Sequence, residues 1–159
     1  MNKRELIQKF ITELEAELAN LEAQIKANKE EATHEESKPE NEYDTRALEM
    51  GYLVKAQSKR ILDAKETLAA FKHTPVRDFD SSTPIAATAL IELDLNGKSQ
   101  WFLYMPSGGG VSVNFSGQKV QVMTPSSPLG GALLSLKQGD IATLESGKEI
   151  KEYEILSVQ

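Results

Sequence analysis

"ELIQKFITELEAELANLEAQI", residues 5–25, carries large apolar side chains at alternating intervals of four and three residues. That spacing places them on one face of an α-helix and is typical of a coiled-coil seam. Acidic residues lie between them, on positions that would face water. The seam comprises Ile7, Ile11, Leu14, Leu18, Leu21 and Ile25, and the acids are Glu13, Glu15, Glu17 and Glu22. The pattern predicts one unbroken helix from Lys3 to about Ala32.

A long amphipathic helix needs a partner for its apolar face. Residues 38–72 supply a second, weaker heptad pattern, formed by Leu48, Tyr52, Leu62 and Ala69. We therefore predict an antiparallel coiled-coil hairpin.

Two capping signals indicate where the hairpin reverses. "THEE" (residues 33–36) and "SKPE" (residues 37–40) each fit a capping box, in which Ser or Thr caps a helix and Glu reaches back to the cap. Pro39 would then fall in the first helical turn, where its missing N–H costs nothing. We expect a turn around residues 32–37 and a second helix beginning near Lys38.

The composition changes near residue 74. Residues 1–73 contain one proline and one glycine, whereas residues 74–159 contain five prolines and nine glycines. The second part alternates strand-like segments with the turn dipeptides Asn96-Gly97 and Ser116-Gly117. The predicted fold class is therefore α+β, with a coiled-coil helical hairpin over residues 1–74 and a small antiparallel β domain containing one short helix over residues 75–159.

Two segments of the second part could contain binding residues. "WFLY" (residues 101–104) predicts a strand with one buried face, and an exposed member of it would be a candidate for docking a partner. "SPLGGALLSLKQGD" begins at Ser127 and predicts a helix capped by Ser126 or Ser127, with Pro128 early and Gly139 at its end. Capping and core burial account fully for Ser127, Pro128 and Leu129.

Charge is concentrated in one short segment. Residues 30–44 hold seven acidic residues and one lysine, so they account for a formal net charge equal to that of the whole chain, −6. A charge run of this kind is by itself most often a solvated loop. We do not expect independent nucleic-acid binding, because the chain offers no basic surface to neutralise phosphates.

Several classes of site and location are excluded by composition. The chain has no cysteine, which rules out disulfides and thiolate chemistry, and its two histidines cannot form a multi-histidine zinc site. No apolar run approaches the roughly 18 residues of a membrane span. The N-terminal residues do not resemble a secretory signal. We expect a cytoplasmic protein without membrane partners.

Residues 124–158, "TPSSPLGGALLSLKQGDIATLESGKEIKEYEILSV", resemble the signature of the bacterial transcript-cleavage factors of the Gre family (GreA and GreB). The matching positions are Ser127, Pro128, Leu129, Ala132, Leu133, Leu134, Gly139, Asp140, Tyr153, Glu154, Ile155 and Leu156. The resemblance implies an FKBP-like fold for the second domain. It also implies a partner, RNA polymerase, whose secondary channel would receive the hairpin and whose rim would hold the second domain.

The resemblance implies a role for the acidic tip. In Gre factors, tip acids help hold a second Mg²⁺ at the polymerase active centre, which then cuts its own backtracked RNA. When Glu42-Tyr43 is aligned with the family pattern, the first family acid falls on Glu36 and the second on Pro39, beside Glu40. This chain lacks the Gly-Asp-Leu-Ser portion of that pattern and has "GGG" at residues 108–110 where the family has an acidic loop, as in a divergent Gre-like branch.

The candidate site residues follow from this alignment. Glu36 and Glu40 would assist catalysis, and Glu36, Glu40, Glu42 and Asp44 would share Mg²⁺ with the polymerase. Glu40 and Asp44 are one helical turn apart and would share a face. Tyr43 and Arg46 would contact the channel wall or RNA, although hairpin packing and an ion pair between Glu42 and Arg46 explain them as well.

We predict a transcription elongation factor that stimulates cleavage of backtracked RNA and contacts the RNA 3′ end only indirectly. It would not be an enzyme itself, but at most an activator of the polymerase nuclease activity. One alternative is a channel-binding regulator or inhibitor of polymerase that does not promote cleavage. A third is an FKBP-like peptide-binding module.

Overall fold

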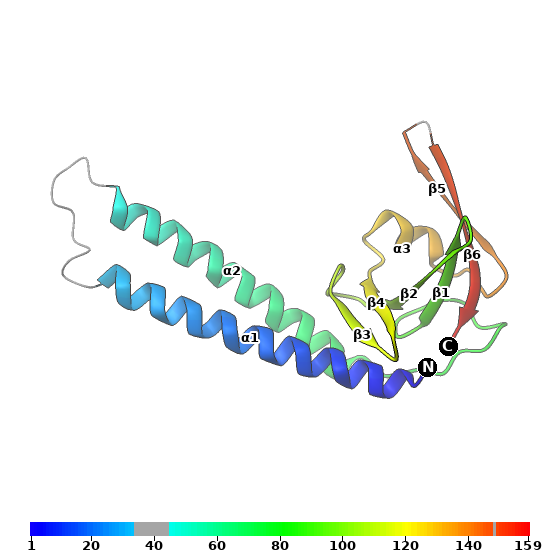
Figure 1. Cartoon of the computed structure of the whole chain (residues 1–159), viewed down its shortest axis with the longest axis horizontal. Helices are drawn as coiled ribbons and strands as arrows, with labels where there is room; N and C mark the ends of the chain where they lie inside the picture. The colour runs from blue at the N-terminus through cyan, green and yellow to red at the C-terminus, as the bar shows by residue number, and fades with distance from the viewer. Residues whose placement is uncertain (34–44, 148) are drawn as a thin grey trace. The chain divides into compact units, whose positions relative to one another are not determined.

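The computed structural model describes residues 1–33, 45–147 and 149–159 (Figure 1). It contains a helical hairpin followed by strands with one short helix, so the predicted α+β class is confirmed. The elements are α1 (Lys3–Thr33), α2 (Arg46–His73), β1 (Leu90–Leu95), β2 (Lys98–Tyr104), β3 (Ser112–Phe115), β4 (Gln118–Met123), α3 (Pro128–Leu133), β5 (Ile141–Ser146) and β6 (Glu149–Val158).

The chain forms two compact units. One is the hairpin unit, Thr12–Leu68, and the other is the sheet unit, which combines Met1–Ile11 with Ala69–Gln159. The base of each helix therefore belongs to the sheet unit, where the rings of Phe10 and Phe71 lie 5.3 Å apart. The predicted domain bounds, residues 1–74 and 75–159, stay a prediction.

Side-chain pairing shows that the two helices of the hairpin unit run antiparallel. Glu22 Oε1 lies 2.9 Å from Lys65 Nζ, and further along α1 the Asn28 Nδ2 donates to Gln57 Oε1 at 2.8 Å. The partner position on α2 falls as the position on α1 rises. Between these pairs lies an apolar cluster of Leu21, Ile25 and Ile61, flanked by Leu18, Val54 and Ala64.

The predicted seam is confirmed on α1 and wrong on α2. Leu14, Leu21 and Ile25 are buried on α1, with exposed fractions of 3%, 6% and 9%. On α2, Leu48, Tyr52 and Leu62 are 58%, 65% and 66% exposed, and Ala69 is exposed as well. The observed α2 seam consists of Val54, Gln57, Ile61 and Ala64. Two of these four residues are weakly apolar, since Gln57 is polar and Ala64 is small. The larger apolar side chains on the opposite face of α2 therefore gave the stronger heptad pattern.

Helix α2 also begins later than predicted. Thr45 is not helical, and α2 begins at Arg46 rather than near Lys38. The Thr45 carbonyl accepts the Glu49 N–H at 2.9 Å, and the Thr45 hydroxyl donates to Glu49 Oε1 at 3.1 Å. These bonds give α2 its own start at Thr45. Most of the residues of the two predicted capping boxes lie outside the described residues.

Gly51 lies inside α2 with nothing within 4 Å of the position that a Cβ would take. Glycine in an exposed helix interior costs stability relative to alanine because the unfolded chain has more backbone freedom to lose. We therefore expect Gly51→Ala to raise the free energy of unfolding by about 0.5–1 kcal/mol. Thermal denaturation followed by circular dichroism measures this change. A lowered midpoint would show that the backbone at this position is not helical in solution.

The six strands form one sheet in the order β3-β4-β2-β1-β6-β5. Every neighbouring pair is antiparallel except β2 and β4, which pair parallel with Trp101 opposite Val120. The sequence predicts an antiparallel β domain, and the β2–β4 pair is the exception to it among the described strands. The β3–β4 hairpin follows a crossing loop, residues 105–111, so β4 runs in the same direction as β2. The two predicted turns are confirmed, since Asn96, Gly97, Ser116 and Gly117 all have positive φ, as type I′ turns require.

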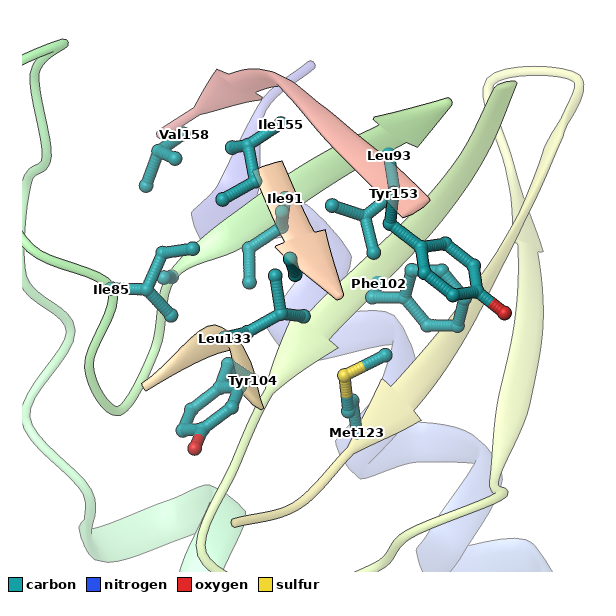
Figure 2. Close-up of a cluster of buried hydrophobic side chains, with 12 residues drawn as sticks. Ile85, Ile91, Leu93, Phe102, Tyr104, Met123, Leu133, Tyr153, Ile155 and Val158 are labelled. Carbon is teal, nitrogen blue, oxygen red and sulfur yellow. The ribbon is translucent and has the colours of Figure 1, made fainter. Parts of the chain in front are cut away.

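Strand β2 is buried on both faces rather than one. Phe102 and Tyr104 point to one face with Ile91 and Leu93, where Figure 2 shows Leu133 of α3 among them. Leu103 alternates with them and is fully buried on the other face, where its cross-strand partner is Leu90. A strand that is buried on both faces has apolar residues at consecutive positions, and residues 101–104, "WFLY", have this pattern.

Helix α3 is shorter than predicted. Ser127 caps it and Pro128 occupies its first turn, but the helix ends at Leu133, and Ser135 adopts a left-handed φ of 70°. Gly139 does not end the helix; it lies in the turn before β5, where its N–H donates to the Ile155 carbonyl at 2.8 Å.

Candidate functional site

The predicted acidic site lies between the described ends of the two hairpin helices. Helix α1 ends at Thr33 and α2 begins at Arg46, and the antiparallel pairing places these ends at the same end of the hairpin unit (Figure 1). The predicted catalytic, metal-binding and contact residues Glu36, Glu40, Glu42, Tyr43 and Asp44 lie outside the described residues. Arg46 is described, and it is exposed at the first position of α2.

Two of the seven acids of residues 30–44 are described, and they lie at the end of α1. Glu30 and Glu31 are exposed in the last turns of α1, and the last turn of α1 contains no basic residue. Carbonyl groups at a helix C-terminus carry partial negative charge, which cations normally offset there. The end of α1 therefore presents negative potential without a basic side chain in its last turn, next to the segment that holds the remaining acids.

The described residues do not supply a metal site of their own. Within residues 1–33, 45–147 and 149–159, no group of three or more His, Asp or Glu side chains could hold a metal ion. The Mg²⁺ ligands predicted from the sequence stay a prediction. The same ranges contain no helix long and apolar enough to cross a membrane.

Asp80 has a strongly shifted pKa, and a local turn explains it. Its Oδ1 accepts the hydroxyls of Thr83 at 2.7 Å and Ser82 at 2.8 Å, together with the Ser82 N–H at 2.9 Å. These hydrogen bonds lower the pKa of Asp80 to about 2, because they favour the charged carboxylate. The oxygen that accepts these bonds closes the turn, so the shift points to a structural role.

The Ser-Pro-Leu segment of the recognised motif also has a structural role. Ser127 Oγ accepts the Gly130 N–H at 3.0 Å and donates to the Thr124 carbonyl at 2.9 Å. The Tyr104 hydroxyl donates to the Gly130 carbonyl at 2.9 Å, which fixes α3 against β2. Leu129 packs against the core cluster. Capping and core packing therefore account for this segment, as expected.

Gly130 is the residue that permits this close packing. A Cβ at this position would lie 2.0 Å from the Thr124 carbonyl oxygen, whereas a Cβ on Gly131 would lie 3.4 Å from its nearest neighbour. We expect Gly130→Ala to lower the free energy of unfolding by at least about 2 kcal/mol through this clash. Gly131→Ala, the matched control one residue away, should leave it unchanged or slightly raised. Equal effects of the two substitutions in urea denaturation would contradict this explanation.

Trp101 is the least buried of residues 101–104, the group in which an exposed member would be a docking candidate. It is half-buried, whereas Phe102, Leu103 and Tyr104 are buried. It lies at the point where the pairing of β2 with β4 begins, beside a shallow hollow of about 340 Å³. The hollow is lined by Ser99, Gln100, Trp101, Phe102, Gln118, Lys119 and Gln121.

Lys3 is a buried cation that sequence reasoning missed. It is only 9% exposed; its Nζ donates to the Arg77 carbonyl and lies 4.7 Å from the centre of the Phe79 ring. Desolvation lowers the pKa of Lys3 from its usual 10.5, Asp78 partly offsets this effect, and Arg4 adds to it. The contact ties the start of α1 to the segment that follows α2. A lysine three residues before an apolar pair, Leu6-Ile7, gives no sign of burial in the sequence.

The lowered pKa of Lys3 predicts a pH dependence. Between its folded-state pKa and 10.5, the unfolded chain binds more protons at Lys3 than the folded chain does. The stability contributed by Lys3 should therefore rise as pH increases through this window. The free energy of unfolding of the unaltered chain, minus that of Lys3→Met, should increase toward pH 10.5 in denaturant titrations. A difference that falls with pH would show that folded Lys3 holds its proton more tightly than usual.

Comparison with known proteins places the chain beside Gre-type factors. No protein-family model matches the chain, and neither does any curated protein. Among solved structures the chain is similar to Gfh1 and to GreA/GreB transcription factors.

Three such structures represent this similarity. GreA factor homolog 1 (Gfh1) of Thermus thermophilus is 18% identical over 94% of each chain, with a TM-score of 0.37. Gfh1 of Thermus aquaticus is 15% identical over 93% of this chain and 92% of that chain, with a TM-score of 0.38. The GreA/GreB elongation factor of Nitrosomonas europaea is 18% identical over 70% of this chain and 92% of that chain, with a TM-score of 0.36. Similarity at this level does not transfer the role of any residue.

Proposed function

We propose that this chain is an RNA polymerase secondary-channel factor that promotes cleavage of backtracked RNA. In this proposal the hairpin enters the channel and brings the acids of residues 30–44 to the polymerase active centre. The observation that supports it most is the position of the charge: the segment holding a net charge equal to the whole chain's −6 joins the two helices at one end of the hairpin unit.

The dimensions of the hairpin suit a probe. The part of α1 that belongs to the hairpin unit, Thr12–Thr33, has 22 residues, so at 1.5 Å per residue it extends about 33 Å. The paired seam with α2 makes this length a supported arm rather than a single helix. An arm of this kind can deliver charged groups deep into a narrow opening in a partner.

The chemistry of the segment suits assistance to a metal ion. Mg²⁺ prefers oxygen ligands and keeps several waters, so one or two carboxylates are enough to help hold it. Two metal ions can stabilise both the attacking and the leaving oxygen of phosphodiester hydrolysis. Mg²⁺ gives up its waters reluctantly, so this segment should bind it weakly alone and better where the polymerase supplies further oxygen ligands. The chain would then activate the polymerase nuclease activity without being an enzyme itself.

In this proposal Glu36 and Glu40 assist the metal, Glu42 and Asp44 support them, and Tyr43 and Arg46 contact the partner. A second candidate function keeps the docking and omits the chemistry. Pro39 stands where the Gre pattern places its second acid, and this favours a channel-binding regulator or inhibitor of polymerase.

A cleavage assay distinguishes the two. Purified protein is added with Mg²⁺ to stalled, backtracked elongation complexes, and the length of the RNA is followed. We expect shortening of the RNA, and we expect Glu36→Ala/Glu40→Ala to slow it at least about tenfold, equivalent to 1.4 kcal/mol or more. Glu17→Ala/Asp63→Ala removes two exposed hairpin acids outside the segment and should leave the rate unchanged.

The outcomes separate the candidates clearly. Binding to polymerase without RNA shortening, together with slower nucleotide addition, would establish the regulator. Failure to bind purified polymerase would contradict both functions.

A further inference from the structure

Helix α2 carries every large apolar side chain that the described hairpin unit exposes. Leu48, Tyr52, Leu53 and Leu62 are 58%, 65%, 44% and 66% exposed, and α1 exposes none of comparable size. The exposed positions of α1 instead include the small residues Ala16, Ala19 and Ala23. The two helices therefore present different surfaces to their surroundings.

Three of the four exposed residues lie on one line along α2. Leu48, Tyr52, Lys55, Lys59 and Leu62 follow one another at intervals of four and three residues, and all five are exposed. We call these five residues the outer stripe. It has the spacing of a coiled-coil seam, but it faces away from Val54 and Ile61, which pack against α1. It extends about 21 Å along the helix at 1.5 Å per residue.

Gly51 has no side chain to cover the helix backbone beside the outer stripe, and it is exposed. It lies three residues from Leu48 and four from Lys55, so it shares their face of the helix. Nothing lies within 4 Å of the position its Cβ would take. A residue that costs helix stability while packing against nothing in its own chain suits close approach by another molecule.

The charge of the outer stripe restricts its partner. In an antiparallel pairing with a second copy, Lys55 would face Lys55, and in a parallel pairing both lysines would face their counterparts, so either pairing brings like charges together, which a partner with carboxylates avoids. A nucleic acid would gain only two cations and would meet leucines. A protein surface with apolar side chains and nearby carboxylates complements both the leucines and the lysines.

We propose that the outer stripe of α2 is the face by which the hairpin binds the wall of the polymerase channel, against a protein surface of apolar side chains and carboxylates. This inference rests on the proposed function. It assigns the partner contact to α2, and it leaves the alanine-bearing face of α1 turned away from the wall. The tyrosine and leucines would become buried, and the lysines would pair with acids at the edge of the contact.

Photocrosslinking and affinity measurements with purified core RNA polymerase test the assignment. A photoreactive phenylalanine analogue is placed at Tyr52 or, as the matched control, at Ala16 on α1. We expect crosslinking to polymerase from position 52 and little from position 16. Tyr52→Ser/Leu62→Ser should weaken binding at least about tenfold, and Lys55→Glu/Lys59→Glu should weaken it most at low salt. All of these positions are exposed, so circular dichroism should show an intact hairpin.

Gly51→Gln provides a variant in which stability and binding move in opposite directions. Glutamine is a better helix former than glycine, so the hairpin should become more stable, while its side chain should obstruct close approach and weaken binding. A merely structural role of this face would not produce that combination.

The failure of this inference differs from the failure of the proposed function. If the unaltered protein binds polymerase but the stripe variants bind equally well, or if crosslinks arise only from position 16, the outer stripe is not the contact. If the unaltered protein does not bind polymerase, both proposals are overturned. Concentration-dependent dimerisation that Tyr52→Ser/Leu62→Ser abolishes would overturn the assignment of the outer stripe to polymerase. The stripe would then bind a second copy of the chain.

Discussion

The antiparallel packing of α1 against α2 is the constraint on which the rest of the structure depends. Leu21, Ile25 and Ile61 bury the shared seam, and the bond between Asn28 and Gln57 adds a polar pair of defined geometry within it. A polar pair in a coiled-coil seam can set the register, because a slip of the helices would separate its donor from its acceptor. This register sets which residues of α1 and α2 lie at the described end of the arm, and the exposed acids Glu30 and Glu31 are among them.

The acidic segment occupies a defined place in the order of elements, between α1 and α2. An acidic segment in an arbitrary surface loop would be only a solvated run. Here the segment follows and precedes two long paired helices in the sequence, and its first two acids, Glu30 and Glu31, lie on an α1 end that has no basic residue in its last turn. Other contacts stabilise the sheet unit. Gly130 lets α3 pack closely against the Thr124 carbonyl, and the buried Lys3 donates a hydrogen bond to the Arg77 carbonyl.

The sequence predicted elements well where one physical signal dominated. The six-residue seam of α1 and the two Gly-containing turns, Asn96-Gly97 and Ser116-Gly117, each have one favourable conformation, and all were confirmed. The α2 seam was misplaced because Gln57 and Ala64 are weakly apolar, while Leu48, Tyr52 and Leu62 on the outer face imitate a seam. The parallel β2–β4 pair and the burial of Lys3 depend on contacts distant in the sequence, which local patterns do not encode. The predicted site acids from Glu36 to Asp44 lie outside the described residues, so they stay predictions.

The central claim is that the acidic segment reaches the metal of the polymerase active centre. Localised radical cleavage tests it most directly: Fe²⁺ replaces Mg²⁺ in the polymerase, hydroxyl radicals form at the metal, and the bound chain is cut where it lies nearest. The proposed function predicts cuts confined to residues 34–44 and the adjoining ends of α1 and α2. Cuts confined to the sheet unit, or no cuts in a chain that is bound, would contradict it.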